Sequence, residues 1–595
     1  MIIEAFPFQG LRRMFRFTIN AGSNGSQFPW RNAVLAAGLL AWPATGRADV
    51  ITDVNNALLN IIQNTSAALV DGPPEVAREI AMVNGAMFDA VNAASGSPFA
   101  ALAYRGGAVP GASASAAALS AAIAVMHDLY ESPTSIYQTY RGVTGAAFYG
   151  ASSPYAGTAV GPSISQMAIV ASDISSLMAE LSALGSAAAV TNGSSLGTAA
   201  GNAMVTARAA DGSVAANLSS LTPYVPVGSG TVAGVYVPPT ARPALDPAGG
   251  TVLPFGLTSA TLSALVNAVP PVPVITTQAY ALQILQTECQ GAGSALPANI
   301  ASVCHAAGFA PETTAEAAAA LFWNDPGSTY QPPGHWLQIA DTVADARILT
   351  LLQHARLDSL VGAAMSDAGS AVWAIKFRDN LWRPITAIRD CNAWNTFFTT
   401  CDAAWTSLIG TPPHPDYLAG HPGFSGAAAT VLANFFGTDS IPFSSTSQPY
   451  CNAGAASRDA TGNVIACTLN GQTYAASNLD RFGCNNAATQ PIMNPDFTAN
   501  PLYNASPLIC PITETFAGFS DASSGALGST FSRVAGGIHT PISVENAVAL
   551  GNAIGQEIAV ANGIGEPGTT ALLVTSLAAF AAVRRRRPAL CTKPE

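Results

Sequence analysis

Charged side chains are scarce in this sequence, where Asp, Glu, Lys and Arg together make up 10% of 595 residues. The formal net charge is −11, with 24 basic and 35 acidic side chains, so the chain lacks the basic surface that a nucleic acid needs. Histidine is scarcer still, with seven in the chain, and no Cys/His spacing resembles a zinc site. Nucleic acid is therefore not expected as a partner, and we expect the cysteines to be structural.

Long runs that alternate apolar and polar residues are also lacking. Alanine-rich stretches instead carry apolar residues at spacings of three and four, which predicts helices and a mainly α fold built of helical bundles with long irregular loops. We expect an N-terminal helical domain over residues 49–222, a Pro/Gly-rich linker belt over 223–272 and a C-terminal helical catalytic domain over 273–561. An irregular insertion rich in Gly, Ser, Asn and Cys is expected at about 440–530.

The two ends have the composition of targeting segments. Arginines, the apolar run AVLAAGLLAWPA and small residues before Asp49 predict a secretory leader over 1–48, and RRMFRF also suggests twin-arginine export. Residues 562–595 contain a Glu-Pro-Gly turn, a short apolar run and four arginines. They resemble the PEP-type sorting signal of exosortase substrates, with a simple membrane tail as the alternative. The sequence thus predicts a protein exported to the cell surface or extracellular matrix of a Gram-negative bacterium. Exosortase-type machinery would process it, and this segment alone would contact the membrane.

Eight of the nine cysteines lie between Cys289 and Cys510, and the ninth follows the arginine block. An even number of cysteines in an exported protein predicts disulfides. Their close spacing suggests two pairs, Cys289 with Cys304 and Cys391 with Cys401.

The segment WAIKFRDNLWRPITAIRD concentrates basic residues. Seven positions separate Lys376 from Arg383, so on one helix both would project from the same face about 10 Å apart and converge on one anion. Pro384 would end or kink that helix and set the direction of the arginine. The alternative is a solvated basic face paired with Asp379 and Asp390.

The segment PPHPDYLAGHPGFSG leads into a small-residue helix. Gly420 lets the backbone approach a ligand, and His421 stands at the helix N-terminus, where unpaired amides and the helix dipole suit an anion. There His421 could transfer protons to or from an oxyanion near neutral pH. The alternative is a histidine that only caps its own helix.

The segment SRVAGGIHTPISVENAVAL places Arg533 and His539 six positions apart around a Gly-Gly bend. The bend can turn both side chains toward one point, which a regular helix would not do at this spacing. The alternative is a loop histidine whose hydrogen bonds are satisfied locally.

Taken in order, Lys-x6-Arg-Pro, Gly-His and Ser-Arg-x5-His resemble the signature shared by vanadium-dependent haloperoxidases and their related acid phosphatases. REIAMVNGAMFDAVNA, LPFGL and FWNDPGSTYQPPGHWLQIA are similar to segments of secreted bacterial haloperoxidases, so the resemblance covers most of residues 50–560. It implies vanadate as cofactor, with hydrogen peroxide, a halide and a small organic compound as substrates.

The resemblance also implies a role for each residue. Lys376, Arg383, Arg533 and the backbone N–H of Gly420 would bind the equatorial oxygens of vanadate. His539 would be the vanadium ligand, and His421 the acid–base group. Lys376 would also polarise peroxide so that the halide can attack it. The oxidised halide would be released as a hypohalous species, which halogenates organic substrates.

Further positions carry finer expectations from the resemblance. Trp373 matches a position near the halide route, with core packing as the alternative, and Asp325 is a candidate carboxylate partner for Arg533. His414 suggests bromide or iodide rather than chloride. Ala419 departs from the family pattern Pro-Ser-Gly-His, in which the serine hydroxyl donates to an equatorial oxygen.

Two other functions stay open. A phosphatase on the same scaffold would use His539 as nucleophile and His421 as leaving-group acid. A non-catalytic surface or matrix protein with a degenerate site would show no turnover. The large N-terminal helical region favours the haloperoxidase branch, because the related phosphatases are much shorter.

Overall fold

The computed structural model describes residues 50–564 with short gaps and one longer gap. The gaps are 226–231, 239–241, 294, 399–400, 449, 452–454, 459–463, 470–471, 476–507 and 510–511. The expected leader, nearly all of the expected sorting segment and much of the expected insertion thus lie outside the described residues.

Helices dominate the described chain, as the sequence predicts. The helices of the first half are α1 (Val50–Thr65), α2 (Pro73–Ala94), α3 (Ala114–Met126), α4 (Ile136–Thr139), α5 (Gly145–Tyr149), α6 (Ile164–Ala183), α7 (Ala188–Arg208), α8 (Ser213–Ser219), α9 (Ser259–Ala268) and α10 (Gln278–Gln290). Those of the second half are α11 (Ala298–Ala307), α12 (Thr314–Phe322), α13 (Gln331–Ala346), α14 (Leu351–Asp379), α15 (Pro384–Arg389), α16 (Gly420–Phe436), α18 (Phe519–Ser524), α19 (Ser529–Ala535) and α20 (Pro541–Ala561). None of the described helices is long and apolar enough to cross a membrane.

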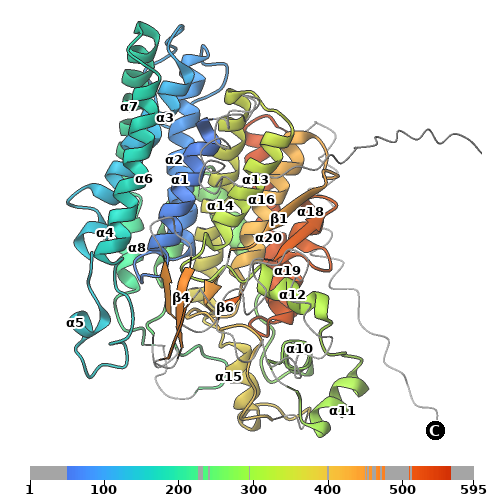
Figure 1. The fold of residues 1–595 in the computed structure, drawn as a ribbon. Helices are drawn as coiled ribbons and strands as arrows, with labels where there is room; N and C mark the ends of the chain where they lie inside the picture. Colours follow the sequence, from blue (N-terminus) through green and yellow to red (C-terminus); the bar gives the residue numbers. More distant parts are fainter. Residues whose placement is uncertain are drawn as a thin grey trace, which may run out of the picture. The chain divides into compact units, whose positions relative to one another are not determined.

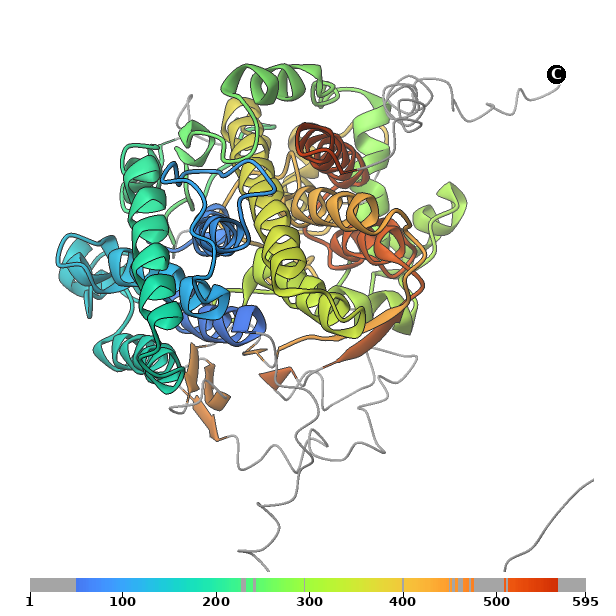
Figure 2. The ribbon, with the colours of Figure 1, turned by 90° about the horizontal axis from the view of Figure 1, so that it is seen from above.

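The 29-residue helix α14 is the central element of the core. A capping box between Thr350 and Gln353 starts it, and Asn380 ends it in the left-handed conformation. It packs against α2 on one side and against α16 and α20 on the other (Figures 1 and 2). Because 21 of its residues are buried, α14 can deliver a polar side chain from its last turn deep into the protein.

Helices α16 and α20 approach closely through glycines. A Cβ atom on Gly551 would lie 2.2 Å from the carbonyl oxygen of Gly423, and one on Gly555 would lie 2.6 Å from that of Ala427. Any larger side chain would therefore force the two backbones apart. This contact holds the N-terminus of α16 beside the loop that precedes α20, where two of the expected site segments meet.

The strands are short and lie in the expected insertion. They are β1 (Phe443–Thr446), β2 (Tyr450–Cys451), β3 (Ala455–Arg458), β4 (Val464–Leu469), β5 (Gln472–Ala475), β6 (Leu508–Ile509) and β7 (Thr513–Phe516). β1 pairs antiparallel with β7 in the register Phe443 to Phe516, β2 pairs with β6, and β3, β4 and β5 form a three-stranded sheet. The expectation of a wholly irregular insertion is thus wrong for its described part. Strands of two to six residues are too short to give a visible alternating pattern.

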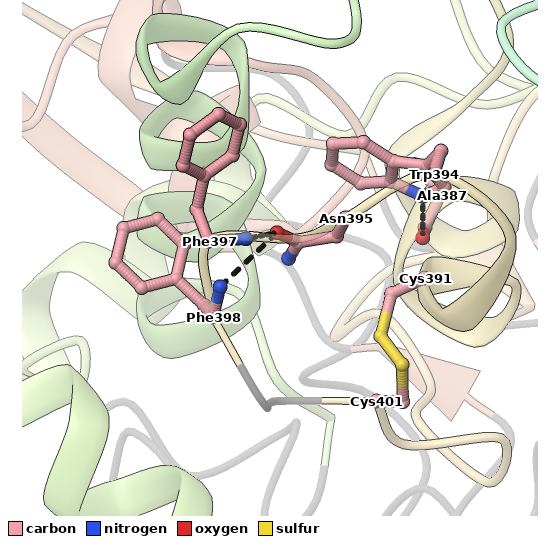
Figure 3. The surroundings of a disulfide bond; sticks show 7 residues. All are labelled: Ala387, Cys391, Trp394, Asn395, Phe397, Phe398 and Cys401. Atoms are coloured by element: carbon pink, nitrogen blue, oxygen red, sulfur yellow. Dashed lines mark hydrogen bonds between the residues drawn. A yellow bond between two sulfur atoms is a disulfide. The ribbon is translucent and has the colours of Figure 1, made fainter.

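Both expected disulfides are confirmed. Cys289 pairs with Cys304 and so joins α10 to α11, and Cys391 pairs with Cys401 in the loop after α15 (Figure 3). Beside the second bond, the indole of Trp394 donates to the carbonyl oxygen of Ala387 at 2.9 Å. The remaining four cysteines of this half have no described side chains, so their pairing stays a prediction.

One hydrophobic core runs from α1 to α20. It contains residues from both sides of the expected linker belt, among them Ile62, Met87, Trp336, Trp373 and Ile554. The division into an N-terminal domain and a C-terminal domain therefore stays a prediction.

Candidate functional site

Lys376 and Arg383 reach the same loop, but not as neighbours on one helix. α14 ends at Asp379, so Arg383 lies beyond it as the N-cap of α15, which begins at Pro384. Lys376 Nζ donates to the carbonyl oxygen of Pro415 at 2.9 Å, and Arg383 Nε donates to that of His414 at 2.5 Å. The two side chains do converge, as expected. The prediction that both lie on one helix is wrong, because the left-handed Asn380 ends α14 before Arg383.

Both side chains are buried, which contradicts the alternative of a solvated basic face. Lys376 is 0% exposed and Arg383 is 2% exposed. Burial, followed by the nearby Arg383 guanidinium, lowers the pKa of Lys376 well below its usual range, and burial lowers the pKa of Arg383 to about 10. Two buried cations this close repel each other, so an anion between them would be strongly stabilised.

His539 precedes α20, and both nitrogens of its ring make hydrogen bonds. Its Nδ1 lies 2.5 Å from Oδ1 of Asp416, and Arg383 Nη1 lies 3.1 Å from its Nε2. A guanidinium can only donate, so Nε2 carries the lone pair and the proton sits on Nδ1, where the carboxylate accepts it. Burial and Arg383 lower the pKa of His539 well below its usual range, which keeps the ring neutral. The imidazole thus offers one directed lone pair toward the cations.

Asp416 is a functional residue that the sequence reasoning missed. It is fully buried, and its Oδ2 accepts a hydrogen bond from Thr540 Oγ1 at 2.8 Å. Burial raises its pKa to about 6, while Arg383 and Thr540 favour the charged form. The sequence contains one sign of this role, because Asp416 is an acidic residue in a proline-rich run of a chain with few charges. Its partner lies 123 positions away, so its role could not be read from local sequence.

The N-terminus of α16 lacks a capping side chain. Ala419 is the N-cap and makes no side-chain cap, so the first amides of α16 are left to other acceptors. His421, one residue into the helix, directs Nε2 to the carbonyl oxygen of Asn324 at 3.2 Å rather than back to its own helix. Burial and the charge of Arg533 lower its pKa well below the usual range, so this histidine is neutral. Because a carbonyl oxygen can only accept, Nε2 carries the proton and Nδ1 the lone pair.

Gly420 packs closely against a tryptophan at the same place. A Cβ atom on Gly420 would lie 3.3 Å from the indole of Trp373. Trp373 is 1% exposed, with its ring centroid 5.0 Å from that of His414 and 5.5 Å from Lys376 Nζ. Trp373 therefore packs in the core and also forms one wall of the cation cluster.

His414 faces the cluster as a hydrogen-bond acceptor. Arg383 Nη2 donates to its Nδ1 at 2.9 Å, so the proton of this ring sits on Nε2. Burial, Lys376 and Arg383 lower the pKa of His414 well below the usual range. The ring is neutral and adds no charge to the cluster.

Arg533 approaches from α19 and is fully buried. It donates from Nη2 to the carbonyl oxygen of Ala320 at 3.0 Å and from Nε to Ser532 Oγ at 3.1 Å. Its positive charge contributes to the lowered pKa of His421. The Gly536-Gly537 bend after α19 carries the chain on to His539, as the sequence suggested.

Asp325 lies against a different partner. Its carboxylate faces Nδ1 of His335 at 3.1 and 3.2 Å, and Nε2 of that ring lies 2.9 Å from Ser445 Oγ. This chain of contacts ties α13 to β1 under the rings of Phe322 and Trp323. The expected pairing of Asp325 with Arg533 stays a prediction.

The donors of this cluster fit a tetrahedral oxyanion. The structure brings together Lys376, Arg383 and the uncapped start of α16, where the charge of Arg533 acts on His421. The carboxylate of Asp416 is engaged with His539 and Thr540. Guanidinium and amide groups match phosphate-like oxygens in both geometry and charge. The neutral Nε2 of His539 adds a nucleophile or metal ligand. Such a combination suits a tetrahedral oxyanion such as phosphate or vanadate.

Comparison with known proteins agrees with this chemistry. Residues 356–562 match the family model described as the second helical-bundle domain of VCPO. Over 88 residues the chain is 33% identical to vanadium chloroperoxidase of Curvularia inaequalis, a segment that spans 14% of either protein.

Solved structures share the fold over much more of the chain. A bacterial vanadium-dependent iodoperoxidase superposes with a TM-score of 0.55 at 16% identity, over 88% of this chain and 99% of that one. The apo form of a bacterial vanadium-dependent chloroperoxidase gives 0.52 at 14% identity, over 83% and 94%. Residues 356–562 therefore resemble the second helical-bundle domain of VCPO, and the chain has the mainly helical fold of these solved structures.

Proposed function

We propose that the protein is a vanadate-dependent haloperoxidase, which uses hydrogen peroxide to oxidise a halide to a hypohalous species that halogenates small organic compounds. The observation that carries the proposal is the state of His539. Its Nδ1 proton is committed to Asp416, so its Nε2 lone pair points at the guanidinium of Arg383, where an oxyanion would bind. A neutral acceptor nitrogen that is held among buried cations is what a histidine ligand to a metal-containing oxyanion requires.

Each residue has a defined task in this proposal. Lys376, Arg383, Arg533 and the Gly420 amide bind the oxyanion, and the Nε2 atom of His539 is the metal ligand. Arg383 and Lys376 exchange their present contacts with His539 Nε2 and the Pro415 carbonyl for contacts with the anion. Neutral His421 accepts and returns protons beside it. When bound, vanadate supplies the Lewis acid that activates peroxide.

Bromide or iodide is the proposed halide rather than chloride. His414 and Trp373 form one wall of the cluster, with ring centroids 5.0 Å apart. A neutral imidazole and an indole are polarizable surfaces, which suit large and weakly hydrated halides.

A parallel assay of the purified protein tests the proposal. Vanadate-saturated protein should brominate or iodinate a phenol dye in the presence of peroxide, and vanadate-free protein should not. Aryl phosphate hydrolysis that vanadate inhibits would instead identify a phosphatase, because a bound phosphoryl group could be attacked by His539. If neither reaction occurs with saturating vanadate, the protein is a non-catalytic member of its fold.

Ala419→Ser should tighten vanadate binding. The new hydroxyl stands at the N-cap of α16, next to Gly420, where it can donate to an anion. One hydrogen bond to a charged acceptor contributes about 1.5–3 kcal/mol, so the dissociation constant should fall roughly ten- to a hundredfold. The dissociation constant is measured from the halogenation rate at increasing vanadate concentrations.

Ala433→Ser is the control, since it adds the same hydroxyl farther along α16, away from the cluster. Equal effects of both substitutions would contradict a specific contact at position 419. Thermal unfolding should be recorded too, because a serine at the N-cap can also stabilise α16 itself.

Export completes the proposal. A leader over residues 1–48 and an exosortase-type signal over 562–595 would deliver the protein to the cell surface or matrix of a Gram-negative bacterium. Two disulfides support an oxidising compartment. Mass spectrometry of the native protein should find Asp49 at the N-terminus and no arginine block at the C-terminus.

A further inference from the structure

A second polar cluster lies in the core where α1, α13 and α14 meet. Its members are Asp341 of α13, His354 and Asp358 of α14, and Asn55 of α1, and each is at most 5% exposed. His354 and Asp358 are four residues apart, so they share one face of α14. One ligand atom from each of Asp341, His354 and Asp358 lies within 4.8 Å of the other two.

The contacts inside this cluster close a ring. His354 Nε2 lies 3.0 Å from Asp341 Oδ1 and 3.2 Å from Asp358 Oδ2. The Asn55 amide nitrogen lies 2.8 and 2.9 Å from the same two oxygens. Such distances suit hydrogen bonds, but neighbouring ligand atoms around a small ion with bonds of about 2.0–2.2 Å have the same spacing.

The cluster has too little positive charge for its two carboxylates. Among the described residues, neither Asp341 nor Asp358 has an ion pair with lysine or arginine, and their only ionic partner is the imidazole of His354. Asp358 Oδ1 and Asn55 Oδ1 are buried without a hydrogen bond in the described structure. Buried carboxylates and amide oxygens without partners are costly, so a further positive group is expected.

We propose that Asp341, His354, Asp358 and the amide oxygen of Asn55 bind a divalent transition-metal ion such as Zn²⁺ or Mn²⁺. Amide nitrogen and oxygen are interchangeable by rotation, so turning the Asn55 amide points Oδ1 at the ion and leaves no unpaired oxygen on that side chain. Two carboxylates balance the charge of a divalent ion. An imidazole ligand favours a transition metal over Ca²⁺, which takes six to eight oxygen ligands.

This ion has a structural role and is separate from the oxyanion site. His354 and Lys376 are 22 positions apart on α14, which corresponds to about 33 Å along the helix. The ligands come from the consecutive helices α13 and α14 and from α1, whose Asn55 lies 286 positions before Asp341, so the ion joins α1 to the central helix (Figure 1). Ion binding to the folded chain alone would add to its stability.

Metal analysis of the full, untagged protein tests the proposal. After dialysis against Zn²⁺ or Mn²⁺ and removal of free ion, elemental mass spectrometry should find about one ion per chain. Asp358→Asn should lose most of this ion. Asp345→Asn is the matched control, because Asp345 also lies on α13 and contacts α1 through Thr52, but at an exposed position outside the cluster. The control should keep its ion.

A second measurement uses only the wild-type protein, so it tests the proposal even if Asp358→Asn fails to fold. Its melting temperature should fall after treatment with a strong chelator and recover when Zn²⁺ or Mn²⁺ is restored. A wild-type protein that holds no ion after dialysis, and melts at the same temperature with and without chelator, overturns the proposal. Equal metal content in wild-type protein and a folded Asp358→Asn variant also overturns it.

Discussion

His539→Ala should reduce halogenation to the level of the vanadate-free protein. Nε2 of His539 is the neutral donor atom that the structure aims at the cations, so its loss removes the single protein ligand to the metal. Lys376, Arg383 and Arg533 would still attract the anion, but only through charge and hydrogen bonds. Initial rates with bromide and iodide, at several vanadate concentrations, measure the effect.

The matched control is His305→Ala, which removes an exposed histidine from the last turn of α11. It should retain wild-type rates, and circular dichroism should show that both variants are folded. Halogenation by His539→Ala at more than half of the wild-type rate, at saturating vanadate, would show that the metal is held elsewhere.

Asp416→Asn should weaken vanadate binding or turnover by roughly ten- to a hundredfold, the usual effect of removing a carboxylate behind a metal-binding histidine. The asparagine oxygen can still accept from His539 Nδ1, but it carries no charge. The imidazole becomes a poorer ligand, and this loss should outweigh the removal of one negative charge beside Arg383 and Lys376, which would by itself favour an anion. The vanadate dissociation constant and the pH dependence of the rate should both change.

Asp416→Ala separates orientation from charge, because it removes the acceptor altogether, and it should lower activity further than Asp416→Asn. Asp379→Asn serves as the control for a lost carboxylate, since Asp379 pairs with exposed Arg378 at the end of α14. An Asp416→Asn variant with an unchanged dissociation constant and pH profile would reduce the residue to a structural role.

The sequence is a good guide to the helices and to the charged members of the site. Helical spacing and the lack of alternation predict the mainly α fold, and the three short motifs contain Lys376, Arg383, His421, Arg533 and His539. Local pattern also predicts both described disulfides. These features depend on residue types within a short window, which a sequence displays directly.

The sequence is a poor guide where the outcome depends on a partner far along the chain. A spacing of seven residues matches two helical turns and so predicts one helix for Lys376 and Arg383, but the left-handed Asn380 ends α14 between them. An acidic residue in a proline-rich run is the one local sign of Asp416, and it does not reveal the partners His539 and Thr540, which fold beside it from another segment. The short strands of the insertion escape prediction for the same reason, since β1 pairs with β7 across some 70 residues.

The sequence alone therefore determined the chemical inventory of this protein: its helices, its cations, its histidines and the alanine at position 419. Tertiary structure decided which of these groups are neutral, which are charged and where their lone pairs point. Protonation and tautomer depend on burial and on atoms a few ångströms away, and these are supplied by segments distant in the chain. The close contact of α16 with α20 brings His421 and His539 to one cluster and so turns three separate motifs into one site.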